Sequence, residues 1–141
     1  MHIHFDSDQL LHQHQLRKTP VRKEVLDVFL SRSEAVSQQY IEQHFDAIDR
    51  VTLYRTLKTF EQKGIIHRAI DGSETIKYAL CSDGCHEHAH FDEHAHFHCD
   101  DCGKTICLEQ IQAPKVLVPN HMRVNSAHLI IKGLCEQCNN A

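Results

Sequence analysis

The sequence of 141 residues predicts an α+β fold in two parts, three helices closed by a β-hairpin and then a smaller unit bound by cysteines. Three observations predict it. Apolar residues recur with helical spacing as far as Lys63-Gly64, β-like runs then surround Asp71-Gly72, and two Cys-x-x-Cys pairs lie in the last third of the chain. We expect the first part to span residues 1–80, a hinge rich in metal-ligand residues 81–98, and the second part 99–141.

The helices are predicted from their start signals and from the apolar spacing that follows. Thr19 before Pro20 offers an N-cap oxygen and a proline at the first helical position, and Ser37 and Asp49 supply similar caps. Apolar residues then recur every three or four positions, which is the period of an amphipathic helix. A short polar helix over residues 6–15 is expected ahead of these three.

A change of period marks the end of the helical region. The β-like runs 65–69 and 75–80 flank Asp71-Gly72, a strong hairpin signal. Three helices closed by a hairpin is the order of a winged helix, although a generic small α+β domain would show the same pattern. In the second part we expect a short helix from Cys107 to Gln112 and strands at 116–118 and 128–132.

Composition points to metal binding. The chain holds 7 Cys and 14 His, and six of these histidines fall between Cys85 and Cys99. The N-terminus has no basic start followed by an apolar run, and no stretch is long enough to span a membrane. We therefore expect a cytoplasmic protein without membrane contact, whose odd number of cysteines serves as metal ligands rather than as disulfides.

The net charge of −4 is unevenly distributed. Residues 1–80 carry 11 Lys and Arg against 11 Asp and Glu, whereas residues 81–141 carry 4 against 8. Neutrality of the first part does not exclude DNA binding, because the distribution of charge over one face matters more than its sum. The acidic excess lies with the metal-ligand residues, where bound cations would offset it.

The two cysteine pairs predict a structural zinc site. Cys99 and Cys102 are followed, 33 residues later, by Cys135 and Cys138. Two intervening residues let both sulfurs of a pair reach one metal, and two pairs supply four thiolates in a tetrahedron, which is the coordination of closed structural zinc. A redox Cys-x-x-Cys would not explain the second pair, and an iron–sulfur cluster is an alternative that spacing alone does not exclude.

The order of motifs resembles one known family. The segment DRVTLYRTL, which begins at Asp49, is followed by the hairpin, the histidine-rich stretch and Cys99-x-x-Cys102-Gly-Lys. From about Leu16 to Cys138 this resembles the ferric uptake regulator (Fur) family. The resemblance implies a homodimeric, metal-dependent repressor with an N-terminal winged helix and a C-terminal α/β dimerisation domain. It further implies DNA contacts from Arg17, Arg22, Thr52, Tyr54 and Arg55.

The physical chemistry of two of these residues suits base recognition. An arginine such as Arg55 can bridge guanine O6 and N7, and a tyrosine ring such as that of Tyr54 can pack on a thymine methyl group. The alternative is that Tyr54 is a core aromatic residue and Arg55 a solvated charge.

The resemblance also implies a regulatory metal site. Its candidate ligands span the hinge, so that one ion could tie the two parts together, and they are His67, Cys81, His94 and His96. A cysteine at the end of the wing is similar to the zinc uptake regulator (Zur) branch, whereas the iron and peroxide branches carry an extra histidine where this chain has Glu34-Ala35-Val36. Three imidazoles and one thiolate favour tetrahedral zinc; Fe²⁺ and Mn²⁺ are the alternatives. His67 could instead be a surface residue and Cys81 a buried strand residue.

The hinge and the second part hold further candidate metal ligands. Cys107 stands where relatives often have a carboxylate ligand, and it could be a fifth ligand, an oxidation-sensitive thiol or a packed residue. The candidates for an additional metal site are Cys85, His86, His88, His90 and Cys107.

We expect this chain to bind a double-stranded DNA operator and to repress metal-homeostasis genes in response to zinc. An iron- or peroxide-responsive regulator of the same family, or a metal-buffering protein, are the alternatives. Catalytic zinc needs an open coordination position and a nearby general base, and the sequence has no His-Glu-x-x-His or comparable motif. We therefore expect no enzyme activity.

Overall fold

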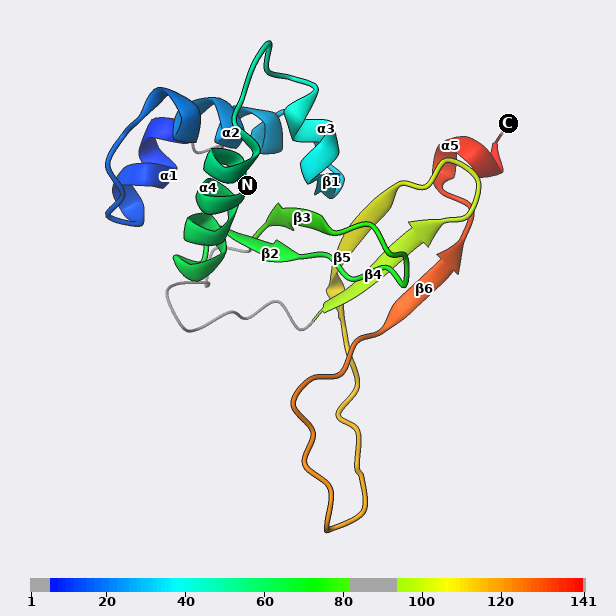
Figure 1. Cartoon of the computed structure of the whole chain (residues 1–141). Coiled ribbons are helices and arrows are strands. Elements are labelled where there is room, and N and C mark those ends of the chain that lie inside the picture. The colour runs from blue at the N-terminus through cyan, green and yellow to red at the C-terminus, as the bar shows by residue number, and fades with distance from the viewer. Residues whose placement is uncertain (1–5, 82–93, 141) are drawn as a thin grey trace.

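The computed structural model describes residues 6–81 and 94–140 and divides them between a helical first half and a second half built on a small sheet (Figure 1). The first half pairs β1, β3 and β2 into an antiparallel sheet beside the helices. In chain order its elements are α1 (Ser7–Gln13), α2 (Pro20–Leu30), β1 (Val36–Ser37), α3 (Gln38–Glu42), α4 (Arg50–Gln62), β2 (Ile66–Arg68) and β3 (Lys77–Leu80).

Local chemistry explains where these helices begin. The Thr19 side chain accepts a hydrogen bond from the backbone N–H of Arg22, and Asp49 caps α4 in the same way through Val51. Helix α4 ends at Gln62 with Lys63 as its C-cap, and Gly64 follows with a φ of 80°. The three predicted helices, the short helix before them and the hairpin are therefore confirmed.

One hydrophobic core holds the first half together. It combines apolar side chains of α1, α2, α3 and α4 with those of β2 and β3, so the four helices and the hairpin bury their apolar faces against one another. Its completely buried members are Leu11, Val25, Leu26, Ile41, Leu53, Phe60 and Ile66.

The second half is a three-stranded sheet in which β4 is central. Its elements are β4 (His94–Cys99), β5 (Thr105–Gln112), β6 (Ile130–Gly133) and the short helix α5 (Glu136–Asn139). β4 pairs with β5 in antiparallel and with β6 in parallel orientation. The helix expected from Cys107 to Gln112 was wrong: this segment belongs to β5, because β4 offers it a complementary edge that a local reading of the sequence does not reveal.

A long connection separates β5 from β6. Residues 114–128 are all exposed, and in Figure 1 they form a loop that extends away from the sheet. The strand expected at 116–118 is absent from this region, where Leu117 is 98% exposed, whereas the strand expected at 128–132 overlaps β6. Among the described residues, no helix has the length and apolar character needed to cross a membrane.

Candidate metal centres and nucleic-acid interface

The first candidate metal centre brings the four cysteines of the two Cys-x-x-Cys pairs together. Cys99, Cys102, Cys135 and Cys138 each offer a sulfur, and these atoms lie within 4.8 Å of one another. The sulfurs of Cys102 and Cys135 are 3.8 Å apart. In a tetrahedral zinc site with Zn–S bonds of about 2.3 Å, neighbouring sulfurs are separated by about 3.8 Å, so the arrangement fits Zn²⁺.

The chain is shaped for this centre by two tight turns. Cys99 ends β4, and the turn after it closes where the N–H of Gly103 donates to the carbonyl of Cys99, with a Gly103 φ of 77° that favours glycine. Cys135 lies between β6 and α5, and its backbone N–H donates to the Cys99 sulfur. Hydrogen bonds from the backbone N–H groups of Cys102 and Cys135 lower the pKa of Cys99 to about 6, which favours the thiolate that a metal requires.

The second candidate metal centre lies between the two halves. His67 of β2 meets His94 and His96 of β4 and Cys107 of β5, with their candidate ligand atoms within 4.8 Å of one another. The three imidazoles are buried, and their ring centroids are 4.8 to 5.8 Å apart. We call this group of four the hinge cluster.

Strand geometry explains how the hinge cluster forms. Successive side chains of a strand point to opposite faces, so His94, His96 and His98 share one face of β4. In the antiparallel pairing of β4 with β5, Cys107 lies directly opposite His96 and therefore reaches the same face. The wing hairpin of β2 and β3 packs on this face and supplies His67.

The hinge cluster differs from the sequence-based set in its fourth member. His67, His94 and His96 come together as expected, but the cysteine that stands with them is Cys107 and not Cys81. Cys81 follows β3 and lies opposite Ile65, since its N–H donates to the Ile65 carbonyl, whereas His67 is opposite Ala79. The sequence offered Cys107 as a possible additional ligand, and the register of β4 with β5, a long-range property of the fold, places it beside His96.

One pair of ligand atoms in the hinge cluster has the spacing of a zinc site. The Cys107 sulfur is 3.5 Å from Nε2 of His67. Tetrahedral zinc with a bond of about 2.0 Å to nitrogen and about 2.3 Å to sulfur places these two ligand atoms about 3.6 Å apart. No carboxylate of the described residues belongs to the group, so its donors are nitrogen and sulfur only. Cys85, His86, His88 and His90 lie outside the described residues.

The residues expected to contact DNA lie on the surface of the first half. Thr52, Tyr54 and Arg55 are exposed on α4, while Leu53, Thr56 and Leu57 of the same helix are buried in the core. Tyr54 is 50% exposed, so it is not a core aromatic residue. Arg17 is exposed and Arg22, partly buried, donates to the backbone carbonyl of Arg17.

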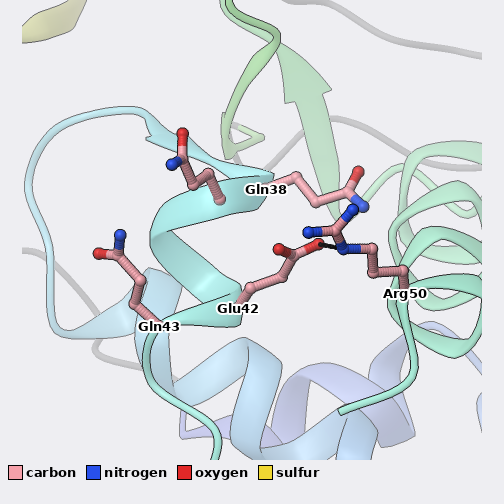
Figure 2. Close-up of a pocket in the computed structure, with 5 residues that line it drawn as sticks. Gln38, Glu42, Gln43 and Arg50 are labelled. Atoms are coloured by element: carbon pink, nitrogen blue, oxygen red, sulfur yellow. Dashed lines mark ion pairs between the residues drawn. The ribbon is translucent and has the colours of Figure 1, made fainter. Parts of the chain in front are cut away.

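A shallow polar pocket lies beside the start of α4, and sequence reasoning did not single it out. Figure 2 shows Glu42 of α3 directed at Arg50 of α4, and the two form an ion pair with an N···O distance of 3.7 Å. Gln38, Gln39 and Gln43 complete the lining. The pair connects α3 to the first residue of α4.

Comparison with known proteins identifies the family of this architecture. Residues 13–132 match the ferric uptake regulator family. The ferric uptake regulation protein of Staphylococcus epidermidis is 30% identical over 140 residues, which cover 94% of each chain. Two solved structures share the fold at 21% identity. The Vibrio cholerae ferric uptake regulator has a TM-score of 0.58, covering 92% of this chain and 100% of its own, and holo XcZur has 0.59, covering 94% and 93%.

Proposed function

Because this chain belongs to the ferric uptake regulator family, we propose that it is a zinc-responsive repressor that binds double-stranded DNA as a homodimer. Proteins of this family are metal-responsive transcriptional regulators and not enzymes. The observation that carries the choice of zinc is the hinge cluster, in which three imidazoles and one thiol converge from both halves of the chain.

The donor set of the hinge cluster favours zinc over iron and manganese. Imidazole and thiolate ligands at tetrahedral spacing suit Zn²⁺, whereas Mn²⁺ prefers oxygen-rich octahedral sites. Cys107 is the decisive residue, because a thiolate is a softer ligand than a carboxylate. We assign the four-cysteine centre to structural zinc and the hinge cluster to regulatory zinc, with Cys81 retained as a competing ligand to be tested.

The proposed mechanism follows from the origin of the four ligands. His67 belongs to the wing, and His94, His96 and Cys107 belong to the second sheet. A bound zinc ion would supply a fixed set of bonds that joins the two halves. The wing and α4 of each subunit then hold one orientation relative to the dimer, so that both copies of Tyr54 and Arg55 can meet successive major grooves.

We further propose that the chain consists of two domains joined by a hinge. We assign residues 1–80 to the DNA-binding domain and residues 99–141 to the dimerisation domain. The intervening 81–98 would be the hinge, although its last residues already belong to β4. Thiolate ligands require a reducing compartment and a regulator requires access to DNA, so we propose a cytoplasmic location.

The experiment that tests this function compares metals on one DNA. A duplex would be selected from a random-sequence library with the zinc-loaded protein, and its affinity measured by fluorescence anisotropy with Zn²⁺, Fe²⁺ or Mn²⁺ after the four-cysteine centre is filled with zinc. We expect added zinc to raise affinity 5- to 150-fold, the usual range of allosteric coupling. Activation by Fe²⁺ or Mn²⁺ at concentrations where added zinc has no effect would overturn the choice of zinc, and failure to select any duplex would overturn the function.

A further inference from the structure

A second polar group joins the wing to the sheet on the same face as the hinge cluster. His98 of β4 lies opposite Thr105 of β5, two residues along each strand from the opposed pair His96 and Cys107. The Thr105 hydroxyl donates to Oδ2 of Asp71 at 2.6 Å, across the boundary between the halves. Oδ2 of Asp71 also lies 3.0 Å from Nζ of Lys77 and 3.3 Å from Nδ1 of His98.

Lys77 and both carboxylate oxygens of Asp71 have specific partners in this group. Nζ of Lys77 donates to the Gly103 carbonyl at 2.7 Å and to the Thr105 hydroxyl at 3.0 Å, so the lysine of the wing reaches the sheet as well. Oδ1 of Asp71 accepts from the backbone N–H and the hydroxyl of Ser73 within the wing loop. One carboxylate oxygen therefore orders the loop, and the other binds the sheet.

The charged side chains of this group are shielded from solvent. The Asp71 side chain is 1% exposed and the Lys77 side chain 14%. Burial raises the pKa of Asp71, but hydrogen bonds from Ser73 and Thr105 outweigh it, and the pKa lies well below its ordinary range. The carboxylate is thus charged at neutral pH, and an undocked wing would leave it without the Thr105 hydroxyl and the neighbouring His98.

We propose that Asp71, Lys77, His98 and Thr105 form a metal-independent anchor that fixes the tip of the wing to the sheet, with Asp71 as a positioning residue for DNA recognition. The hinge cluster fixes one point of the boundary, and Cys107 of that cluster also packs against the small residues Ala35, Ala69 and Ala79 of the first half. A single attachment point leaves the wing able to rotate. Two attachment points on one face define its orientation, and the consequence for DNA binding rests on the proposed function.

The docking itself can be measured without DNA. The backbone N–H of Ala35, in the first half, donates to the carbonyl of Thr105 in the second, so its hydrogen exchange reports docking. In the full-length protein with one equivalent of zinc, Asp71→Asn and Thr105→Val should each accelerate Ala35 exchange about tenfold, as expected for loss of a hydrogen bond to a buried charge. The N–H of Ala69, which donates to Lys77 inside the wing, reports whether the wing remains folded.

A matched variant and a second readout separate the anchor from the metal site. Glu74→Gln makes the same carboxylate-to-amide change at an exposed residue of the same loop and should leave Ala35 exchange unchanged. At saturating zinc, Asp71→Asn and Thr105→Val should weaken binding to the selected duplex about tenfold. The absorption spectrum of Co²⁺ in the hinge cluster should not change, because every proposed ligand is retained.

Unchanged Ala35 exchange in both Asp71→Asn and Thr105→Val would overturn the anchor. Faster exchange of both the Ala69 and the Ala35 amide in both variants would also overturn the anchor, since the group would then stabilise the fold of the wing rather than its docking to the sheet. If Ala35 exchange accelerates alone while zinc fails to activate DNA binding of the unaltered protein, the anchor stands and the proposed function fails.

Discussion

The two candidate metal clusters of this chain differ in where their ligands come from. All four cysteines of the first cluster belong to the second half, within 40 residues of one another, and the chain between them forms β5 and β6. The ligands of the hinge cluster come from β2 in one half and from β4 and β5 in the other. A metal whose ligands all come from one half stabilises that half, whereas a metal whose ligands come from both halves fixes the position of one half relative to the other. The same chemistry therefore predicts a structural role in one place and a regulatory role in the other.

The largest effect should follow from breaking the four-cysteine centre. Cys135→Ser removes one ligand and leaves the other three thiols close together around a weakened site. Structural zinc can contribute on the order of 10 kcal/mol to the folding of a small domain. We expect the variant to lose one equivalent of zinc and the cooperative unfolding of β4, β5 and β6, measured by metal analysis and circular dichroism. If the variant kept both the zinc equivalent and the cooperative unfolding transition, the second half would owe its stability to its sheet alone.

Breaking the hinge cluster should leave the fold intact. We expect Cys107→Ser to keep the melting temperature of the zinc-loaded protein within a few degrees and to reduce zinc activation of DNA binding 5- to 150-fold. Cys81→Ser is the matched control, since it removes a cysteine of similar exposure from the wing side of the boundary. If Cys81→Ser abolished activation while Cys107→Ser did not, the fourth ligand would be Cys81, as the sequence alone suggested.

The comparison also predicts that a residue contacting DNA can be changed without loss of metal from either cluster. Arg55 is exposed on α4, and the two clusters lie on other elements. Arg55→Ala should weaken binding to the selected duplex by about 1–3 kcal/mol, the cost of losing one good base contact, with zinc stoichiometry unchanged. A parallel loss of hinge zinc would show that the helix and the cluster are not independent.

The smallest effect should come from the turn that shapes the four-cysteine centre. Gly103 has a positive φ, and a Cβ at this position would meet no atom within 4 Å, so backbone strain is the whole cost of an alanine. We expect Gly103→Ala to destabilise the second half by about 1–2 kcal/mol and to leave DNA affinity at saturating zinc unchanged. A change in affinity without loss of stability would mean that this turn participates in regulation.

Sequence reasoning succeeded where the signals were local. The caps at Thr19, Ser37 and Asp49 located three helices, and Asp71-Gly72 located the hairpin. The spacing of the cysteine pairs predicted the close approach of four sulfurs, because two residues between cysteines constrain geometry strongly.

Sequence reasoning fell short where the outcome depended on pairing between distant strands. A short helix was expected from Cys107 to Gln112, yet these residues belong to β5, which pairs with β4. That pairing places Cys107 opposite His96, so that its sulfur lies with the three imidazoles of the hinge cluster. Asp71 was visible only as a turn residue, since its second carboxylate oxygen meets Thr105, 34 residues away.

A stepwise zinc titration of the metal-free full-length protein tests the division of labour between the two clusters most directly. Circular dichroism and anisotropy of the selected duplex would be followed together as zinc is added. We predict that the first equivalent folds the second half with little gain in DNA affinity, and that a later equivalent raises DNA affinity without further folding. Full DNA affinity after the first equivalent, or an unchanged late step in Cys107→Ser, would contradict the account.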